Sequence, residues 1–277
     1  MLAAMRTMHL PLAAVVLLCA CASAQDARAS TAASPQTVGV DGSRVLTVRE
    51  IEFPHDAPGK YPRSVLGADG RTYLSWISQV DRQATLRFVE LTAEGFSDAR
   101  TIAEGDDWFV NWADFPSIAA TADGTLAAHW LQRAGGGRYA YGVRVACSTD
   151  GGKTWGEPFW LHEDQSPAEH GFATLVPGPD GGFTGVWLDG RDMRETGSMT
   201  LRSTTFGVSG PTGDEVLIDP KVCDCCPTDA VYSEGELVAV YRDRTDAEIR
   251  DISRLRRVDG VWGESDAANN DLWFTPG

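Results

Sequence analysis

The sequence predicts an all-β fold, a propeller of four-stranded antiparallel blades, and three observations support this prediction. The chain of 277 residues contains 29 glycines, 14 prolines and nine tryptophans, a composition typical of short strands joined by tight turns. Long runs of helix-forming residues are almost absent. A unit made of an Asp-Gly or Glu-Gly turn and an alternating strand that ends in an aromatic residue occurs four times. The aromatic residues, spaced by 54, 57 and 54 positions, are Trp76, Trp130, Trp187 and Tyr241.

Each repeat contains two further strands. A short strand precedes each turn, near residues 64, 116, 172 and 229, and another alternating strand follows the aromatic residue, at 85–91, 141–147, 199–205 and 249–257. We therefore expect four blades, over residues 50–105, 106–165, 166–220 and 221–264. An irregular tail is expected over residues 265–277. The repeated aromatic residues are expected to pack between neighbouring blades.

One turn, in the second repeat, has a more specific sequence than the others. It reads Ser148-Thr-Asp-Gly-Gly-Lys-Thr-Trp155. The Asp150 side chain can hydrogen-bond the backbone two residues on, and Gly152 accepts positive φ without steric cost. Ser148, Asp150, Gly152 and Trp155 are therefore expected to fix the tip of a hairpin, which is a structural role.

The first 24 residues have the pattern of a signal peptide, with Arg6 before an apolar run that is too short to span a membrane. Cleavage before Gln25 is one alternative. The other is a bacterial lipoprotein signal over residues 1–20, because Leu18-Cys-Ala-Cys21 resembles a lipobox in which Cys21 is lipidated. Both predict an exported bacterial protein, in the periplasm, on the outer membrane or secreted. Residues 25–47 are rich in Ala, Ser and Thr and predict a disordered tether.

The net charge of −15 limits the possible partners. Nucleic acids and anionic membranes are recognised by clusters of Lys and Arg, so the sequence argues against both. Membrane association is then expected only through a lipid on Cys21. We expect a monomer, unless another chain completes the ring of blades.

The pattern Ser-x-Asp-x-Gly-x-x-Trp at 148–155 resembles the Asp-box, or bacterial neuraminidase repeat, of the sialidase superfamily. Together with blades of about 55 residues and the export signal, it makes residues 50–264 similar to the six-bladed sialidase propellers. Among these the chain looks most like exported bacterial sialidase-like proteins, which carry motifs similar to Cys223-Asp-Cys-Cys-Pro227 and Tyr241-Arg-Asp-Arg244. The resemblance implies that four of six blades are visible, as in a truncated copy.

Sialidases bind the substrate carboxylate with three Arg, protonate the leaving group with an Asp and use a Tyr paired with a Glu as the nucleophile. The resemblance implies that Arg63 binds the carboxylate of a sialic-acid-like glycan and that Asp81 is the acid. The later Arg and the Tyr normally come from later blades, which this sequence does not show. The predicted function is therefore an exo-α-sialidase-type glycoside hydrolase or an inactive descendant of one. The alternative is a non-catalytic propeller that binds a glycan, a protein or a soft metal.

Residues that precede the innermost strands are expected to crowd one mouth of the central channel. Loops that follow the aromatic strands add further charged groups to this region. The predicted residues of the mouth are Asp114, His170, Asp192, Arg242 and Asp243.

Three cysteines occur within four positions, at Cys223, Cys225 and Cys226. Three interpretations remain open. A disulfide is the usual state in an oxidising compartment, either between Cys225 and Cys226 or to Cys147. A copper(I) or zinc site with His170 is the second, and a catalytic thiol is the third. The predicted glycosidase activity itself requires no cofactor.

Overall fold

The computed structural model describes residues 36–40, 44–48, 50–53, 59–269 and 272, in two units that divide after Glu50. In the first unit β1 (Gln36–Val40) and β2 (Arg44–Val48) pair as an antiparallel hairpin. A disordered tether was expected over this segment from its composition. An Asp-Gly pair with apolar residues at Val38 and Val40 before it and at Val45, Leu46 and Val48 after it is, however, a hairpin signal, and here it outweighs the polar composition. The predicted signal segment 1–24, with Cys21, lies outside the described residues.

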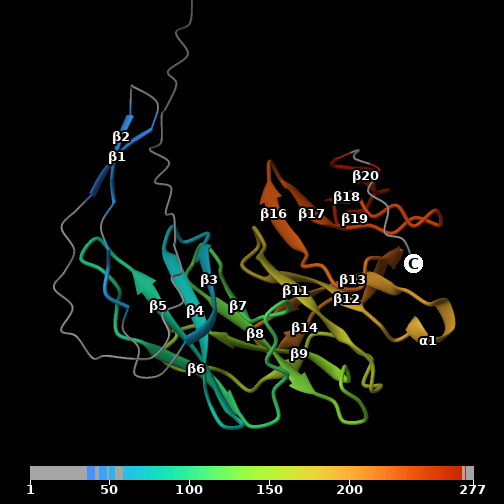
Figure 1. Cartoon of the computed structure of the whole chain (residues 1–277), viewed down its shortest axis with the longest axis horizontal. Helices are drawn as coiled ribbons and strands as arrows, with labels where there is room; N and C mark the ends of the chain where they lie inside the picture. Colours follow the sequence, from blue (N-terminus) through green and yellow to red (C-terminus); the bar gives the residue numbers. More distant parts are fainter. Residues whose placement is uncertain (1–35, 41–43, 49, 54–58, 270–271, 273–277) are drawn as a thin grey trace, which may run out of the picture. The chain divides into compact units, whose positions relative to one another are not determined.

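The second unit consists of four antiparallel sheets (Figure 1). The first contains β3 (Gly59–Leu66), β4 (Thr72–Val80), β5 (Gln83–Leu91) and β6 (Arg100–Gly105). The second contains β7 (Ser117–Ala120), β8 (Leu126–Arg133), β9 (Tyr141–Ser148) and β10 (Phe159–Trp160). The third contains β11 (His170–Pro177), β12 (Phe183–Asp189), β13 (Met199–Gly207), β14 (Gly210–Pro211) and β15 (Val216–Val222). The fourth contains β16 (Asp229–Ser233), β17 (Glu236–Arg242), β18 (Ile252–Val258), β19 (Val261–Trp262) and β20 (Asp266–Ala267).

Two departures from simple four-stranded blades occur. In the third sheet β14 and β15 both pair with β13, and in the fourth sheet β19 and β20 both pair with β18. The β20 strand lies in the segment that was expected to be an irregular tail. A single short helix, α1 (Met193–Thr196), connects β12 and β13, and nothing helical in the described residues has the length and hydrophobicity of a membrane span. The all-β prediction is confirmed.

Successive sheets pack face to face, and their interfaces form the core. The cluster between the first and second sheets contains Trp130, the next contains Trp187, and that between the third and fourth sheets contains Tyr241. These three aromatic residues therefore pack between sheets, as predicted. Trp76 belongs to the first of these four sheets, which has no preceding sheet of the repeat to pack against within the described residues. It instead lies in a separate cluster with Phe53.

The turn at residues 148–155 is fixed by side-chain hydrogen bonds. One carboxylate oxygen of Asp150 accepts the backbone N–H of Thr154 at 2.9 Å, and the other accepts its hydroxyl at 2.7 Å. The Ser148 hydroxyl donates to Asp150 at 2.8 Å. Trp155 then meets Phe88 of the first sheet edge-on, with ring centroids 6.1 Å apart. The turn thus joins the second sheet to the first.

Candidate functional site

The innermost strands β3, β7, β11 and β16 line a channel of about 420 Å³. Each of these strands contributes one polar residue at the same position of the repeat. This residue pairs with the residue of the neighbouring second strand that directly precedes the repeated aromatic residue (Trp76, Trp130, Trp187 or Tyr241). The register of the four sheets thus makes these positions equivalent and builds a polar ring. Its members are Arg63, Ser117, Thr174 and Asp229.

Arg63 and Asp229 come from the first and fourth sheets and approach within 3.8 Å. The side chains are 26% and 68% exposed, so the pair is open to solvent and weak. The Arg63 guanidinium is therefore available to an anionic group in the channel. The structure does not bring Asp81 to this site, because Asp81 lies in the exposed turn between β4 and β5 and lines neither the channel nor the hollow described next.

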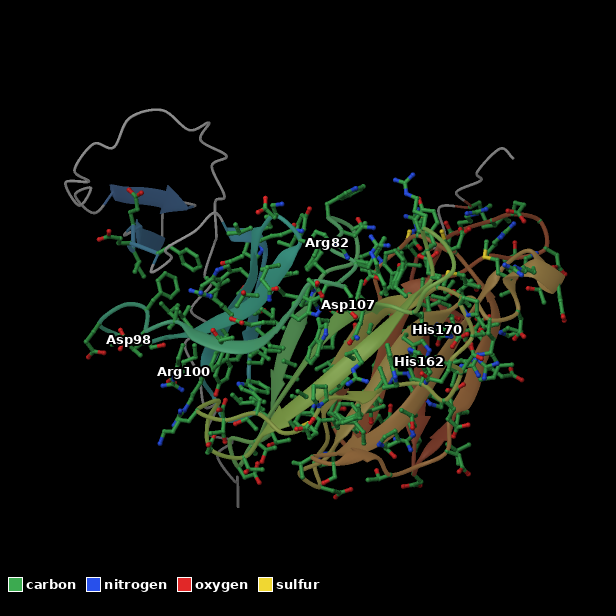
Figure 2. The ribbon with its side chains drawn as sticks, turned by 90° about the horizontal axis from the view of Figure 1, so that it is seen from below. Arg82, Asp98, Arg100, Asp107, His162 and His170 are labelled. Carbon is green, nitrogen blue, oxygen red and sulfur yellow. The ribbon has the colours of Figure 1, made fainter. Side chains whose placement is uncertain are left out.

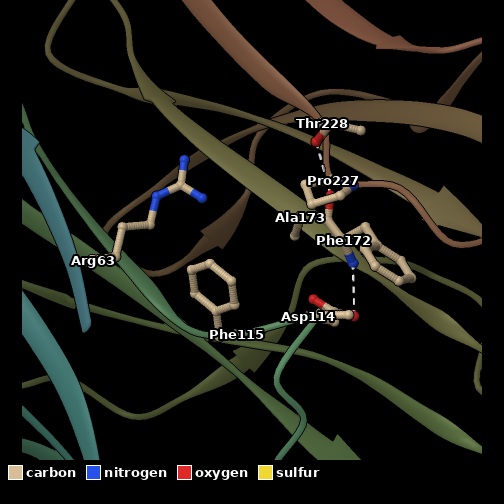
Figure 3. Close-up of a pocket in the computed structure, with 8 residues that line it drawn as sticks. Arg63, Asp114, Phe115, Phe172, Ala173, Pro227 and Thr228 are labelled. Carbon is tan, nitrogen blue, oxygen red and sulfur yellow. Dashed lines mark hydrogen bonds between the residues drawn. The ribbon is translucent and has the colours of Figure 1, made fainter. Parts of the chain in front are cut away.

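A hollow of about 10 Å³, enough for one water molecule, adjoins the channel at Arg63. Asp114 borders it on the side away from Arg63, and Phe115 lies between them (Figure 3). The Asp114 carboxylate accepts the backbone N–H of Phe172 at 2.8 Å and lies 3.2 Å from the Tyr141 hydroxyl. The loop before β7 thus holds a carboxyl group against the start of β11.

Burial raises the pKa of Asp114 to about 7, although its hydrogen bonds from Phe172 and Tyr141 act in the opposite direction. The Tyr141 hydroxyl also lies 2.6 Å from Glu169, whose pKa is raised by burial. A phenol has one proton to donate, and the shorter distance favours donation to Glu169. Without a proton from Tyr141, the protonated form of the Asp114 carboxyl group is favoured, so Asp114 can act as a proton donor near neutral pH.

His170 is not at the mouth, because its side chain is buried with His162 between the second and third sheets (Figure 2). The two rings stack with centroids 4.0 Å apart, and His170 Nε2 lies 2.9 Å from a carboxylate oxygen of Asp164. Burial lowers the pKa of His162 to about 3, so this ring is neutral. The pair belongs to the core of the interface.

The other predicted mouth residues are dispersed. Asp192 precedes α1 and lies 3.6 Å from Arg202. The Arg242 carbonyl accepts the backbone N–H of Cys223 at 3.0 Å, and the Asp243 carboxylate accepts the Ser253 hydroxyl at 3.0 Å. Arg242 and Asp243 therefore belong to the surroundings of the cysteine segment.

The cysteine segment brings three sulfur atoms together at the end of β15. The Sγ atoms of Cys223, Cys225 and Cys226 lie 3.7 to 3.9 Å from one another. Arg250 lies 3.6 Å from the Cys223 sulfur. The hydrogen bond from Cys226, aided by Arg250, lowers the pKa of the Cys223 thiol to about 5.

The expected partners of these sulfurs are not found beside them. The four described cysteines are free, so neither predicted disulfide is formed. Cys147 lies apart in β9, where burial raises the pKa of its thiol to about 12. Within the described residues, the three sulfur atoms form the one group of possible metal ligands that lie within 4.8 Å of one another, and His170 is not part of this group.

Sequence reasoning missed several groups that lie near the channel or adjoin Asp114 along the chain. Trp112, two residues before Asp114, is 78% exposed although large aromatic side chains are usually buried. Tyr141 and Glu169 form the hydrogen-bonded pair beside Asp114. Neither ring nitrogen of His129 is hydrogen-bonded to a described residue, and burial, aided by the charge of Arg63, lowers the pKa of this side chain to about 3. The position of Asp114 just before an innermost strand was the signal that could have led to this group.

No protein-family model matches the sequence, and no curated protein matches it either. Among solved structures, an α-L-arabinanase of Penicillium chrysogenum complexed with arabinobiose is similar at 15% identity, 82% coverage of this chain, 71% of that chain and a TM-score of 0.53. This chain has a β-propeller fold. A protein of unknown function from Dyadobacter fermentans matches this propeller at 15% identity, covering 78% and 71% of the two chains, with a TM-score of 0.51. An α-L-arabinofuranosidase of Fusarium graminearum, in complex with an iminosugar inhibitor, matches at 14% identity, 76% and 67% coverage and a TM-score of 0.50.

Proposed function

We propose that this propeller is a glycoside hydrolase that acts at its central channel, with Asp114 as the general acid. The observation that carries the proposal is a buried carboxyl group with a pKa raised to about 7 beside a channel of about 420 Å³. Hydrolysis of a glycosidic bond at neutral pH requires such a protonated carboxyl group to donate to the leaving oxygen. The likeness in fold to an arabinanase complexed with arabinobiose supports the same class of reaction.

The proposed substrate is an acidic glycan of the sialoside type. Arg63 faces the channel, and its planar guanidinium is suited to a carboxylate that displaces the weak contact to Asp229. The resemblance of residues 148–155 to the sialidase turn motif favours the same substrate. The signal pattern of the first 24 residues places this activity, in our proposal, outside the cytoplasm.

In this scheme Asp114 gives its proton through the adjoining hollow to the glycosidic oxygen, while water attacks the sugar carbon. We assign the proton-accepting role to Asp229, whose carboxylate faces the channel. Asp229 then releases this proton to the medium and Asp114 takes up another, so both carboxyl groups return to their starting states. Arg63 binds and orients the substrate.

The test measures release of an aryl leaving group from an α-sialoside and from an α-L-arabinofuranoside by the full chain. Asp114→Asn should lower turnover of the sialoside by about 10² to 10⁴-fold, and Arg63→Ala should lower it chiefly through KM. The matched controls Asp98→Asn and Arg82→Ala change exposed residues away from the hollow and should leave turnover unchanged. Asp81→Asn decides between the two candidate acids, because a loss of turnover in this variant and not in Asp114→Asn would assign the role to Asp81.

Turnover of the arabinofuranoside alone, unaffected by Arg63→Ala, would contradict the acidic substrate and retain the hydrolase.

A folded chain that turns over neither substrate would favour the second candidate, a non-catalytic glycan-binding propeller. The specific observation for that candidate is Trp112, because an exposed indole directly before Ala113 and Asp114, which line the hollow, offers an apolar face with a polar edge to a sugar. Quenching of tryptophan fluorescence by sialosides that disappears in Trp112→Ala would support it.

A further inference from the structure

We infer that Cys223, Cys225 and Cys226 form a three-thiolate site for one soft d¹⁰ metal ion, copper(I) or zinc, with one coordination position open to solvent. The inference rests on the shape of the sulfur triangle, the way its loop is held and the exposure of one edge. It is independent of the proposed hydrolase activity.

The three sulfur atoms form a nearly equilateral triangle, with separations of 3.7, 3.8 and 3.9 Å. A metal ion bound at about 2.3 Å from each sulfur requires sulfurs about 3.8 Å apart in a tetrahedral site and about 4.0 Å apart in a planar one. A disulfide would instead join two sulfurs at about 2.05 Å and leave the third apart. The observed spacing is that of metal ligands.

The loop that carries the cysteines is held in place by the fourth sheet. Val222, at the end of β15, forms a β-bridge with Asp243, and the Cys223 backbone N–H donates to the Arg242 carbonyl at 3.0 Å. Cys223 itself is buried, and Pro227 follows the cluster directly. The triangle is therefore built on a fixed turn, and binding requires little ordering of the chain.

The charges around the triangle suit a cation surrounded by thiolates. Three thiolates carry more negative charge than one copper(I) or zinc ion, and the Arg250 guanidinium lies 3.6 Å from both the Cys223 sulfur and the Asp224 carboxylate. Arg250 is held in turn by Glu248 at 2.9 Å. A donor set made only of sulfur favours soft ions and disfavours magnesium and calcium, which prefer oxygen.

One edge of the triangle is accessible. Cys225 is exposed and Cys226 is half-buried, whereas Cys223 is covered. Structural zinc sites are closed by four protein ligands, while sites that exchange or activate a ligand keep a position open. We therefore expect an ion that exchanges with chelators and that accepts a small donor from solution.

The experiment uses the full chain in a background with Cys19→Ser and Cys21→Ser, reduced and desalted without oxygen. Copper(I) is titrated against a chromophoric cuprous chelator and, in a parallel arm, zinc against a chromophoric zinc chelator. X-ray absorption at the metal edge then gives the number and distance of the sulfur ligands. Cys225→Ser changes an exposed side chain and should not impair folding, and Cys147→Ser, whose cooperative melt is verified first because this thiol is buried, is the control outside the triangle.

We expect one equivalent of metal per chain, three sulfurs at about 2.3 Å, and the tighter of the two arms to identify the ion. Cys225→Ser should lower the sulfur count to two and the affinity more than about tenfold, whereas Cys147→Ser should change neither. The inference is overturned by uptake below half an equivalent in both arms, by ligands that are only nitrogen or oxygen, or by equal losses in Cys225→Ser and Cys147→Ser.

Discussion

The Asp114 carboxylate of the second sheet accepts the backbone N–H of Phe172 in the third sheet at 2.8 Å, and Phe172 has a φ of 51°. A residue with a Cβ pays roughly 1–2 kcal/mol for this left-handed conformation, so the contact holds a strained point of β11 in place. The Thr228 hydroxyl donates to the Phe172 carbonyl at 2.8 Å from the other side. Phe172 is therefore a junction between three sheets, and the proposed acid holds it from the side of the second sheet.

The first prediction concerns pH and Asp114. Its pKa is raised by burial from 3.8 to about 7, so between these values the folded chain retains a proton that the unfolded chain has lost. Stability should therefore fall as pH rises from about 4 to 7, by an amount on the order of 4 kcal/mol at most, and then level off. Urea unfolding at several pH values between 4 and 8 measures this slope.

The control for this slope is Asp114→Asn, which keeps an oxygen that can accept from Phe172 but does not titrate. Its stability should be less dependent on pH over the same range than that of the unchanged chain. Equal slopes in the two proteins would show that Asp114 ionises normally, and Asp114 would then be a poor general acid at neutral pH.

A second prediction follows from the close packing at Gly171. A Cβ on this residue would lie 2.1 Å from an Asp114 carboxylate oxygen and 2.8 Å from the Tyr141 ring. Gly171→Ala should therefore destabilise the fold by about 1–3 kcal/mol and displace Asp114. Gly137→Ala is the matched control, because a Cβ there meets nothing within 4 Å. Denaturant melts of both variants test this, and similar midpoints would contradict the packing described.

The repeat in the sequence was sufficient to predict the sheets, because four aromatic residues at nearly equal spacing locate the second strand of each. The site was harder to predict. His170 was expected at the mouth, but a β-bulge between Gly171 and Thr174 breaks the alternation of β11, so counting along the strand does not give the direction of its side chain. The pKa of Asp114 depends on burial by distant segments, and no local pattern encodes it.

The resemblance to sialidases led to one residue in the channel and one outside it. Arg63 lies within the innermost strand β3 and pairs with Ser75, directly before the repeated Trp76, so its place follows from the repeat itself. Asp81 was assigned from its loop alone, and turns between the second and third strands differ in length among the sheets, as α1 shows in the third. Loop residues are therefore less well predicted than strand residues.

A third prediction concerns the buried ion pair of Asp189 and Arg191. Asp189 is fully buried, and the Arg191 guanidinium donates to both of its oxygens, at 2.8 and 2.6 Å. Arg191→Ala leaves this charge uncompensated and should cost about 3–5 kcal/mol in free energy of unfolding. Arg194→Ala, in exposed α1, should be neutral.

The pH dependence of the same pair gives an independent check. The hydrogen bonds and charge of Arg191 lower the pKa of Asp189 to about 2 despite burial, so its stabilising effect is present above about pH 4 and is lost as pH falls through 2. In Arg191→Ala the acid transition should move to higher pH. Urea unfolding at pH 7, 4 and 2.5 measures the shift, and an unchanged acid limb would contradict the pairing.

The last prediction tests whether the turn at 148–155 joins the first two sheets. Asp150 is exposed, and the hydrogen bonds it accepts from Thr154 and Ser148 lower the pKa of its carboxyl group. Asp150→Ala removes them, so Tm should fall at neutral pH. Below about pH 4 the Asp150 carboxyl group takes up a proton in the unfolded chain while it is still ionised in the folded one, so the difference in Tm should narrow as pH falls further. Asp180→Ala, in the exposed turn between β11 and β12, is the control and should not alter Tm. Because Trp155 packs on Phe88, the loss should also increase hydrogen exchange in β5, and exchange confined to the turn would show that the two sheets are joined without it.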